Sequence, residues 1–160
     1  PSTAEVWFER PSKLALAGPP QRRIFEADRD RFGVKRLGFD EVAQALKAAC
    51  LLLRRRAPAL KVVLAVSPLP MERTFTGEDV IVANMASKST LHAAAVALAE
   101  RNDWIGYFPA WEAAMTSHPG EAWAADRTGL SPALIDSLAD AFVRQYGLML
   151  TGESRTAGSA

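Results

Sequence analysis

The amino-acid sequence predicts an α/β fold, a three-layer α/β/α sandwich with a mainly parallel sheet. Residues 39–56 show the apolar period of an amphipathic helix, and residues 60–66 follow as an almost uninterrupted apolar run. A run of this length is typical of a strand buried on both faces. A helix, a short turn and such a strand form half of a parallel α/β unit. A further helix, strand and helix follow, so the order alternates after an irregular start.

The composition is that of one folded domain. The 160 residues are 49% hydrophobic and include 19 basic side chains, 18 acidic side chains and one cysteine. A chain of this length buries roughly 70% of its unfolded surface, and one cysteine excludes an intrachain disulfide and a cysteine-rich zinc site. No apolar run approaches the ~20 residues that span a bilayer, and the start does not resemble a signal peptide. We therefore expect a cytoplasmic protein without a membrane partner, with a domain over residues 1–150 and a flexible tail over residues 151–160.

Charge is distributed unevenly along the chain. Residues 1–73 carry a net charge of +6 and residues 74–160 a net charge of −5. The densest basic stretch, residues 21–36, is interleaved with Glu26, Asp28 and Asp30. Alternating signs are typical of a solvated loop or of local ion pairs, whereas a nucleic-acid groove combines basic residues with aromatic ones and fewer acids. Nucleic acid is therefore not the expected partner.

The N-terminal third is predicted to be extended and irregular. Residues 4–9 alternate as a strand does, residues 13–17 form a second short extended segment, and residues 18–37 lack a period and are predicted to be a long loop. The helix at 39–56 begins after Gly38 and ends before Pro58, with three arginines at its negative end. Its predicted apolar face includes Leu53 and Cys50, and we expect the Cys50 thiol to be buried and unreactive.

The C-terminal half contains the predicted ligand crevice. Residues 67–87 are predicted to form a loop at the carboxyl end of a parallel strand, where open α/β sheets bind ligands. A helix at 89–101 with Ser87 or Ser89 as N-cap and a strand at 104–108 follow. Beyond them lie a loop that contains Trp111, Glu112 and His118 and a final helix. That helix begins at Ser131-Pro132 and closes at Gly147.

Few side chains suggest chemistry by their sequence context alone. No glycine-rich phosphate loop, paired-cysteine pattern or His-Glu-x-x-His motif is present, so no metal or cofactor is expected. His92 is predicted to be solvated or to cap its helix. His118, in a loop after a buried strand, is the catalytic candidate of the two histidines. Ser67 precedes a proline at a strand end, where turn formation is the alternative to ligand binding.

Several longer stretches are similar to the GSCFA family. Residues 66–70 (VSPLP), 79–84 (DVIVAN) and 87–91 (SKSTL) resemble the central signature of that family, residues 107–112 (YFPAWE) resemble its YFPSYE segment, and residues 4–7 (AEVW) resemble its GLAEVW segment. The similarity covers residues 3–146 in the order of the family. GSCFA domains are grouped with SGNH-type hydrolases and acyltransferases. The resemblance therefore implies a flavodoxin-like sandwich and the hydrolysis or transfer of acyl groups, with acylated carbohydrates among the expected substrates.

The resemblance also implies a catalytic site, which this sequence matches in part. Such a site needs a serine or cysteine nucleophile, a histidine base and an aspartate that orients the histidine. The Gly-Ser-Cys-Phe-Ala segment lies upstream of AEVW in the family, so we expect a domain that is incomplete at its N-terminus. Asp126 occupies the position of the acid, with a turn aspartate as the alternative, but the histidine position falls on Thr128 or Gly129. His118 is the remaining candidate for the base.

Asn84, Ser87, Lys88 and Glu112 complete the candidate site. Asn84 can offer amide donors and Lys88 can bind an anionic group of a substrate. Alternatively, Asn84, Ser87 and Lys88 cap the following helix and hold the preceding loop in place. Glu112 either faces a substrate or serves as the partner of a loop amide or of Arg127.

Three functions stay open at this point. The first is an SGNH-like domain of hydrolase or acyltransferase ancestry that is inactive as this chain alone. The second is a non-catalytic interaction module, in which a protein partner or a second copy completes the sheet. The third is a carbohydrate- or nucleotide-binding remnant that uses the crevice and the basic stretch at 21–36.

Overall fold

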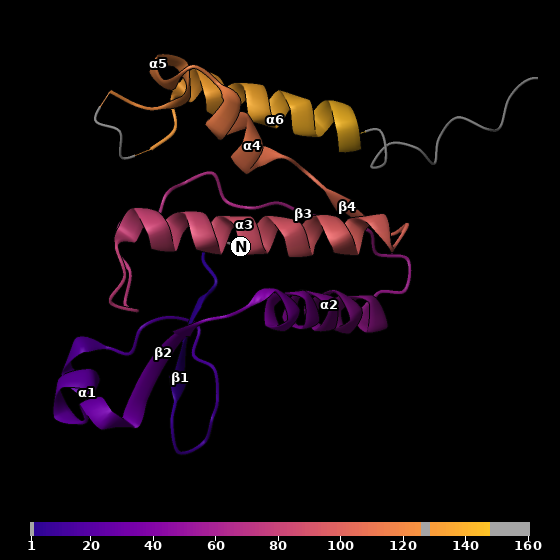
Figure 1. Cartoon of the computed structure of the whole chain (residues 1–160). Helices are drawn as coiled ribbons and strands as arrows, with labels where there is room; N and C mark the ends of the chain where they lie inside the picture. Colours follow the sequence, from indigo (N-terminus) through magenta and orange to yellow (C-terminus); the bar gives the residue numbers. More distant parts are fainter. Residues whose placement is uncertain (1, 126–128, 148–160) are drawn as a thin grey trace, which may run out of the picture.

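A computed structural model describes residues 2–125 and 129–147 (Figure 1). The elements in chain order are β1 (Glu5–Glu9), α1 (Arg22–Ala27), a 3₁₀ turn (Arg29–Arg31), β2 (Phe32–Arg36), α2 (Phe39–Arg56), β3 (Val62–Leu64), α3 (Val80–Glu100), β4 (Ile105–Tyr107), α4 (Ala110–Thr116), α5 (Pro119–Ala122) and α6 (Pro132–Tyr146). The predicted tail at 151–160 lies outside the described residues. Within the described ranges, no helix has both the length and the apolar composition needed to cross a bilayer.

The mixed α/β class is confirmed, and its centre is the unit β3–α3–β4. The two strands are parallel, with Val62 opposite Ile105 and Leu64 opposite Tyr107. Helix α2 packs beside α3 (Figure 1). A buried cluster of Ala4, Val42, Val66, Leu91 and Ala94 joins the start of the chain to these helices and to the end of β3.

Helices cover both faces of β4. Side chains alternate between the faces of a strand, and on one face the ring of Tyr107 lies 5.6 Å from the ring of His92 on α3. On the other face Phe108, just past the strand, makes an edge-to-face contact with Phe142 of α6. A Cβ atom at Gly106 would lie 3.3 Å from the Tyr146 hydroxyl, so the glycine lets α6 approach this face closely.

The predicted loop at 18–37 is wrong, because it contains helix α1 and strand β2. Strand β2 pairs antiparallel with β1, so these strands lie outside the parallel pair. Gly33 lies opposite Phe8, and a Cβ atom there would fall 2.5 Å from the Phe8 ring. The ring of Phe8 therefore occupies the space of a side chain at position 33. Because that position is a glycine, the sequence of β2 lacks the clear alternation of apolar and polar residues that predicts a strand.

The basic stretch at 21–36 makes four ion pairs among the described residues, one with the interleaved Glu26 and three with acids outside the stretch. Each pair joins a basic side chain of the stretch to a nearby carboxylate: Arg22 with Glu26, Arg31 with Glu9, Lys35 with Glu41, and Arg36 with Glu78. These pairs tie the antiparallel unit to itself, to the start of α2 and to the segment before α3.

Helix α2 has the predicted bounds, but its buried face differs in part from the prediction. Val42 and Cys50 are buried, whereas Leu53 is 52% exposed. Burial also raises the pKa of the Cys50 thiol, which agrees with an unreactive cysteine.

Helix α3 begins nine residues earlier than predicted, at Val80. Its N-cap is Asp79, whose carboxylate accepts hydrogen bonds from the backbone N–H groups of Ile81 and Val82 at 2.8 and 3.3 Å. The predicted caps Ser87 and Ser89 both lie inside the helix. The first turn is apolar on every side, with Ile81 and Val82 exposed, so it lacks the period that marks an amphipathic helix.

The predicted loop after β4 is also helical. Trp111 and Glu112 lie in α4, and His118 is the N-cap of α5. The final helix begins as predicted, with the Ser131 hydroxyl accepting the Leu134 N–H at 3.1 Å and Pro132 in the first turn, and Gly147 is its C-cap.

Candidate functional site

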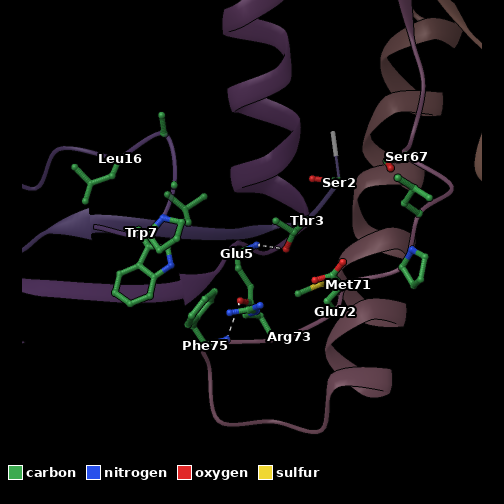
Figure 2. A pocket seen from close by; sticks show the side chains of 16 residues that line it. Ser2, Thr3, Glu5, Trp7, Leu16, Ser67, Met71, Glu72, Arg73 and Phe75 are labelled. Atoms are coloured by element: carbon green, nitrogen blue, oxygen red, sulfur yellow. Dashed lines mark hydrogen bonds between the residues drawn. The ribbon is translucent and has the colours of Figure 1, made fainter. Parts of the chain in front are cut away.

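Two cavities flank the segment that leaves the carboxyl end of β3. The tryptophan cavity has a volume of about 460 Å³ and is lined by Pro68, Pro70, Asn84, Trp111, Met115, Pro119 and Trp123. The β1 cavity has a volume of about 680 Å³ and lies between β1 and residues 67–75 (Figure 2). Pro70 lines both cavities. Residues 67–71 therefore form a wall between them, at the edge of the sheet where the sequence predicted a crevice.

Two residues of α3 pin the ends of this wall. The Asn84 Oδ1 atom accepts the Met71 backbone N–H at 3.0 Å. The Lys88 Nζ atom donates to the Ser67 carbonyl oxygen at 2.7 Å. Asn84 and Lys88 are four residues apart and therefore lie on one face of the helix. The predicted candidates Ser67, Asn84 and Lys88 thus lie together around the wall.

The hydrogen bond from Met71 determines how Asn84 faces the tryptophan cavity. A backbone N–H can only donate, so the amide oxygen of Asn84 must face Met71. The Nδ2 group donates no hydrogen bond to any residue in the described part of the chain. Both of its N–H groups therefore remain available to a ligand in the cavity that Asn84 lines.

Lys88 is completely buried beneath the wall. Its side chain has 0% exposure, and burial lowers its pKa from 10.5 to about 8 because the charged form loses hydration. Ser87 is equally buried, and its hydroxyl has no hydrogen-bond partner among residues 2–125 and 129–147. Lys88 therefore supports the wall and Ser87 lies in the core, whereas Asn84 reaches the cavity surface.

Aromatic and apolar side chains dominate the tryptophan cavity. Trp111 comes from α4, and Trp123 follows α5 directly. Asn84 provides the side-chain amide, and no residue described as lining this cavity is charged. Such a wall suits a neutral ligand that has flat apolar faces and hydrogen-bond acceptors.

Glu112 joins a polar cluster behind Trp111. Its Oε1 atom accepts the Tyr107 hydroxyl at 2.7 Å and lies 2.9 Å from the His92 Nε2 atom. Burial, followed by this hydrogen bond and the charge of Glu112, raises the pKa of Tyr107, so the phenol stays protonated and continues to donate. The Trp111 ring lies 5.8 Å from the His92 ring. The cluster thus holds α4, and Trp111 with it, against α3 and β4.

The sequence predictions missed the part that His92 plays here. His92 was predicted to be solvated or to cap its helix, but its imidazole pairs with Glu112 between Tyr107 and Trp111. The sequence did contain one signal for this position. His92 follows Lys88 by four residues, so the two side chains lie on the same face of the helix. Trp111 and Trp123 had no comparable signal, because their position around one cavity depends on the turn between α4 and α5.

Of the two predicted catalytic residues, only His118 lies within the described structure. The His118 side chain is exposed, and its Nδ1 atom accepts the Gly120 backbone N–H at 3.2 Å, which makes it a helix cap. Asp126 lies outside the described residues. In the described ranges there is also no cluster of three or more His, Cys, Asp or Glu side chains that could hold a metal ion.

Comparison with known families identifies the class of the chain. The family model for GSCFA matches residues 2–142, which is most of the sequence. The chain therefore belongs to the GSCFA family, as its sequence similarity predicted. Comparisons with curated proteins and with solved structures found no match.

Proposed function

We propose that this chain is a ligand-binding GSCFA domain of SGNH-type hydrolase or acyltransferase ancestry, and that it binds an acylated carbohydrate in the tryptophan cavity. The observation that carries this proposal is the pairing of Trp111 and Trp123 with the free amide donors of Asn84. These groups lie at the carboxyl end of a parallel strand pair, the usual ligand position in α/β sheets.

The chemistry of the cavity supports this class of ligand. The C–H groups of a sugar ring are weakly positive and pack well on the negative face of an indole. The carbonyl oxygen of an acetyl or other acyl group accepts hydrogen bonds, and the two Asn84 N–H groups can supply them. The uncharged lining favours a neutral ester over a charged sugar.

The proposal includes that this chain does not hydrolyse esters by itself. Acyl transfer needs a nucleophile within reach of a base. Cys50 is buried and its thiol has a raised pKa, while the imidazole of His118 caps a helix. The Nε2 atom of His92 is engaged with Glu112. These placements support a binding role for the described residues, with catalysis dependent on groups outside them.

We extend the proposal to the architecture of the whole domain, a three-layer α/β/α sandwich with a mainly parallel sheet. The parallel β3–α3–β4 unit supports it, as does the position of α3 and α6 on opposite faces of β4. The antiparallel β1–β2 pair is an addition beside that sheet.

Titration of the intrinsic fluorescence with an acetylated xylo-oligosaccharide tests the binding site. The diagnostic variant is Asn84→Asp, because a carboxylate still accepts the Met71 N–H but presents no donor to the cavity. We expect saturable binding by the unmodified chain and at least a tenfold loss of affinity in the variant. Trp104→Phe, which changes a tryptophan outside both cavities, is the control and should bind normally. No binding by the unmodified chain, or equal binding by Asn84→Asp, would contradict the proposal.

Incubation with a short-chain nitrophenyl ester tests the absence of hydrolysis. We expect no turnover above the uncatalysed rate. Turnover by the unmodified chain that Asp126→Ala abolishes would show that the chain carries a working catalytic site.

A non-catalytic interaction module is the second candidate function, and the free edge of β3 favours it. Val62 and Leu64 direct their backbone groups toward β4, so the N–H and C=O of Val63 point to the other edge. That edge has no strand neighbour in the described part of the chain. In this case a protein strand or a second copy pairs there. Size-exclusion chromatography with light scattering would show a dimer if a second copy does so, and a monomer at high concentration would exclude self-pairing.

A further inference from the structure

The β1 cavity is larger than the tryptophan cavity and has a different chemistry. Figure 2 shows Leu16, Trp7 and Phe75 on one side of it and Ser67 and Met71 on the other. Most of its walls are carbon. Leu69 and Phe75 line it while 46% and 42% exposed, so both present apolar surface that the fold leaves uncovered.

Several polar groups around this cavity are engaged with the protein itself, whereas the Trp7 Nε1 atom is buried and has no hydrogen-bond partner among the described residues. The Glu5 carboxylate accepts the Thr74 hydroxyl and, at 3.1 Å, the Phe75 backbone N–H. The Thr3 hydroxyl accepts the Glu5 N–H at 3.0 Å. The Ser67 carbonyl is bound by Lys88. A ligand therefore meets few unsatisfied hydrogen-bonding groups, and burying carbon is the main contribution available to it.

The charges at the rim do not select an ion. Glu72 and Arg73 both line the cavity and carry opposite signs, and the Glu5 carboxylate already accepts two hydrogen bonds from the protein. A neutral, flexible and apolar group fits these walls best. The volume of about 680 Å³ lies in the range of small-molecule sites.

We propose that the β1 cavity is the acyl-chain subsite of this domain and takes an unbranched aliphatic chain. This inference rests on the proposed function, because it assigns the two cavities to the two halves of one ligand. The carbohydrate lies on Trp111 and Trp123, the chain lies against Trp7 and Phe75, and the ester linkage crosses the wall at Pro70, which both cavities share. The domain thereby selects esters of medium or long chains over acetyl esters.

A series of tetraethylene glycol monoalkyl ethers tests the chain subsite without any sugar. Burial of one CH₂ group is worth about 0.8 kcal/mol, so affinity should rise about fourfold for each methylene added, until the cavity is filled. The probes are the hexyl, octyl and decyl ethers, used below their micelle concentrations. An octyl probe with a terminal bromine should quench the fluorescence of Trp7, and Trp7→Phe should remove that part of the signal.

Leu69→Glu is the diagnostic variant, because it places a charge on the cavity wall at an exposed position. We expect it to lower the octyl affinity at least tenfold and to flatten the dependence on chain length. Leu52→Glu is the matched control, since Leu52 is 60% exposed on α2 and lines neither cavity. Affinity that is independent of chain length, or equal losses in both variants, would overturn the inference. Binding of the ethers together with failure of the acetylated sugar would instead contradict the proposed function and leave the chain subsite in place.

Discussion

Lys88 is a buried ammonium group whose partner is a backbone carbonyl. The four-residue spacing of Asn84 and Lys88 places both on one face of α3, where they contact the segment that begins at Ser67. Their contacts could not be predicted. Which of them reaches the cavity depends on the path of residues 67–71, a segment without regular structure. Asn84 and Lys88 hold that path, and Asn84 alone also lines a cavity.

The depressed pKa of Lys88 predicts a specific dependence of stability on pH. The folded-state pKa is about 8 and the ordinary value is 10.5, so the unfolded chain binds more protons between these pH values. The free energy of unfolding should therefore gain a contribution from Lys88 as pH rises from about 8 to about 10.5. That contribution is complete above 10.5 and is lost as pH falls through 8.

Urea unfolding of the unmodified chain and of Lys88→Met at several pH values isolates this effect. Other titrating groups are common to both proteins and cancel in the difference. The stability of the unmodified chain relative to the variant should increase from pH 8 to pH 10. A difference that stays flat across this range would show that Lys88 is well solvated or has an anionic partner.

At the scale of elements, the start of α3 is the clearest difference between prediction and structure. Asp79→Ala removes the carboxylate that caps Ile81 and Val82, and should lower the free energy of unfolding by about 1 kcal/mol. Ser89→Ala changes the predicted cap, which is an exposed position inside the helix, and should stay within about 0.5 kcal/mol of the unmodified chain. Urea or thermal unfolding measures both. A larger loss for Ser89→Ala than for Asp79→Ala would place the start of the helix where the sequence pattern suggested.

The predictability of each element depended on local signals. Helix α2 was predicted to the residue because Gly38, Pro58 and the terminal arginines mark its ends. Strand β2 was missed because Gly33 interrupts its apolar pattern. The ring of Phe8, on the paired strand β1, fills the space that a side chain at position 33 would occupy. That contact joins residues 25 positions apart, and no local pattern records it.

At the scale of the whole molecule, one short wall separates two cavities of different character. The wall follows β3, is pinned from α3, and faces the tryptophans of the segment after β4 on one side and β1 on the other. The position of the crevice was predictable from the parallel unit. The aromatic lining of the tryptophan cavity was not, because Trp111 and Trp123 come from a segment predicted to be a loop. Family membership assigns the chain to GSCFA but does not by itself assign an activity.

The most direct test of the central claim is the NMR spectrum of the Asn84 side chain during titration with an acetylated xylo-oligosaccharide. If the amide donors of Asn84 bind the acyl carbonyl, the paired Nδ2 proton signals of Asn84 should shift together with the indole N–H signals of Trp111 and Trp123. The indole signal of Trp104 should not move. Saturable shifts elsewhere with the Asn84 signals unchanged, or no shifts at all, would contradict the claim that the tryptophan cavity is the ligand site.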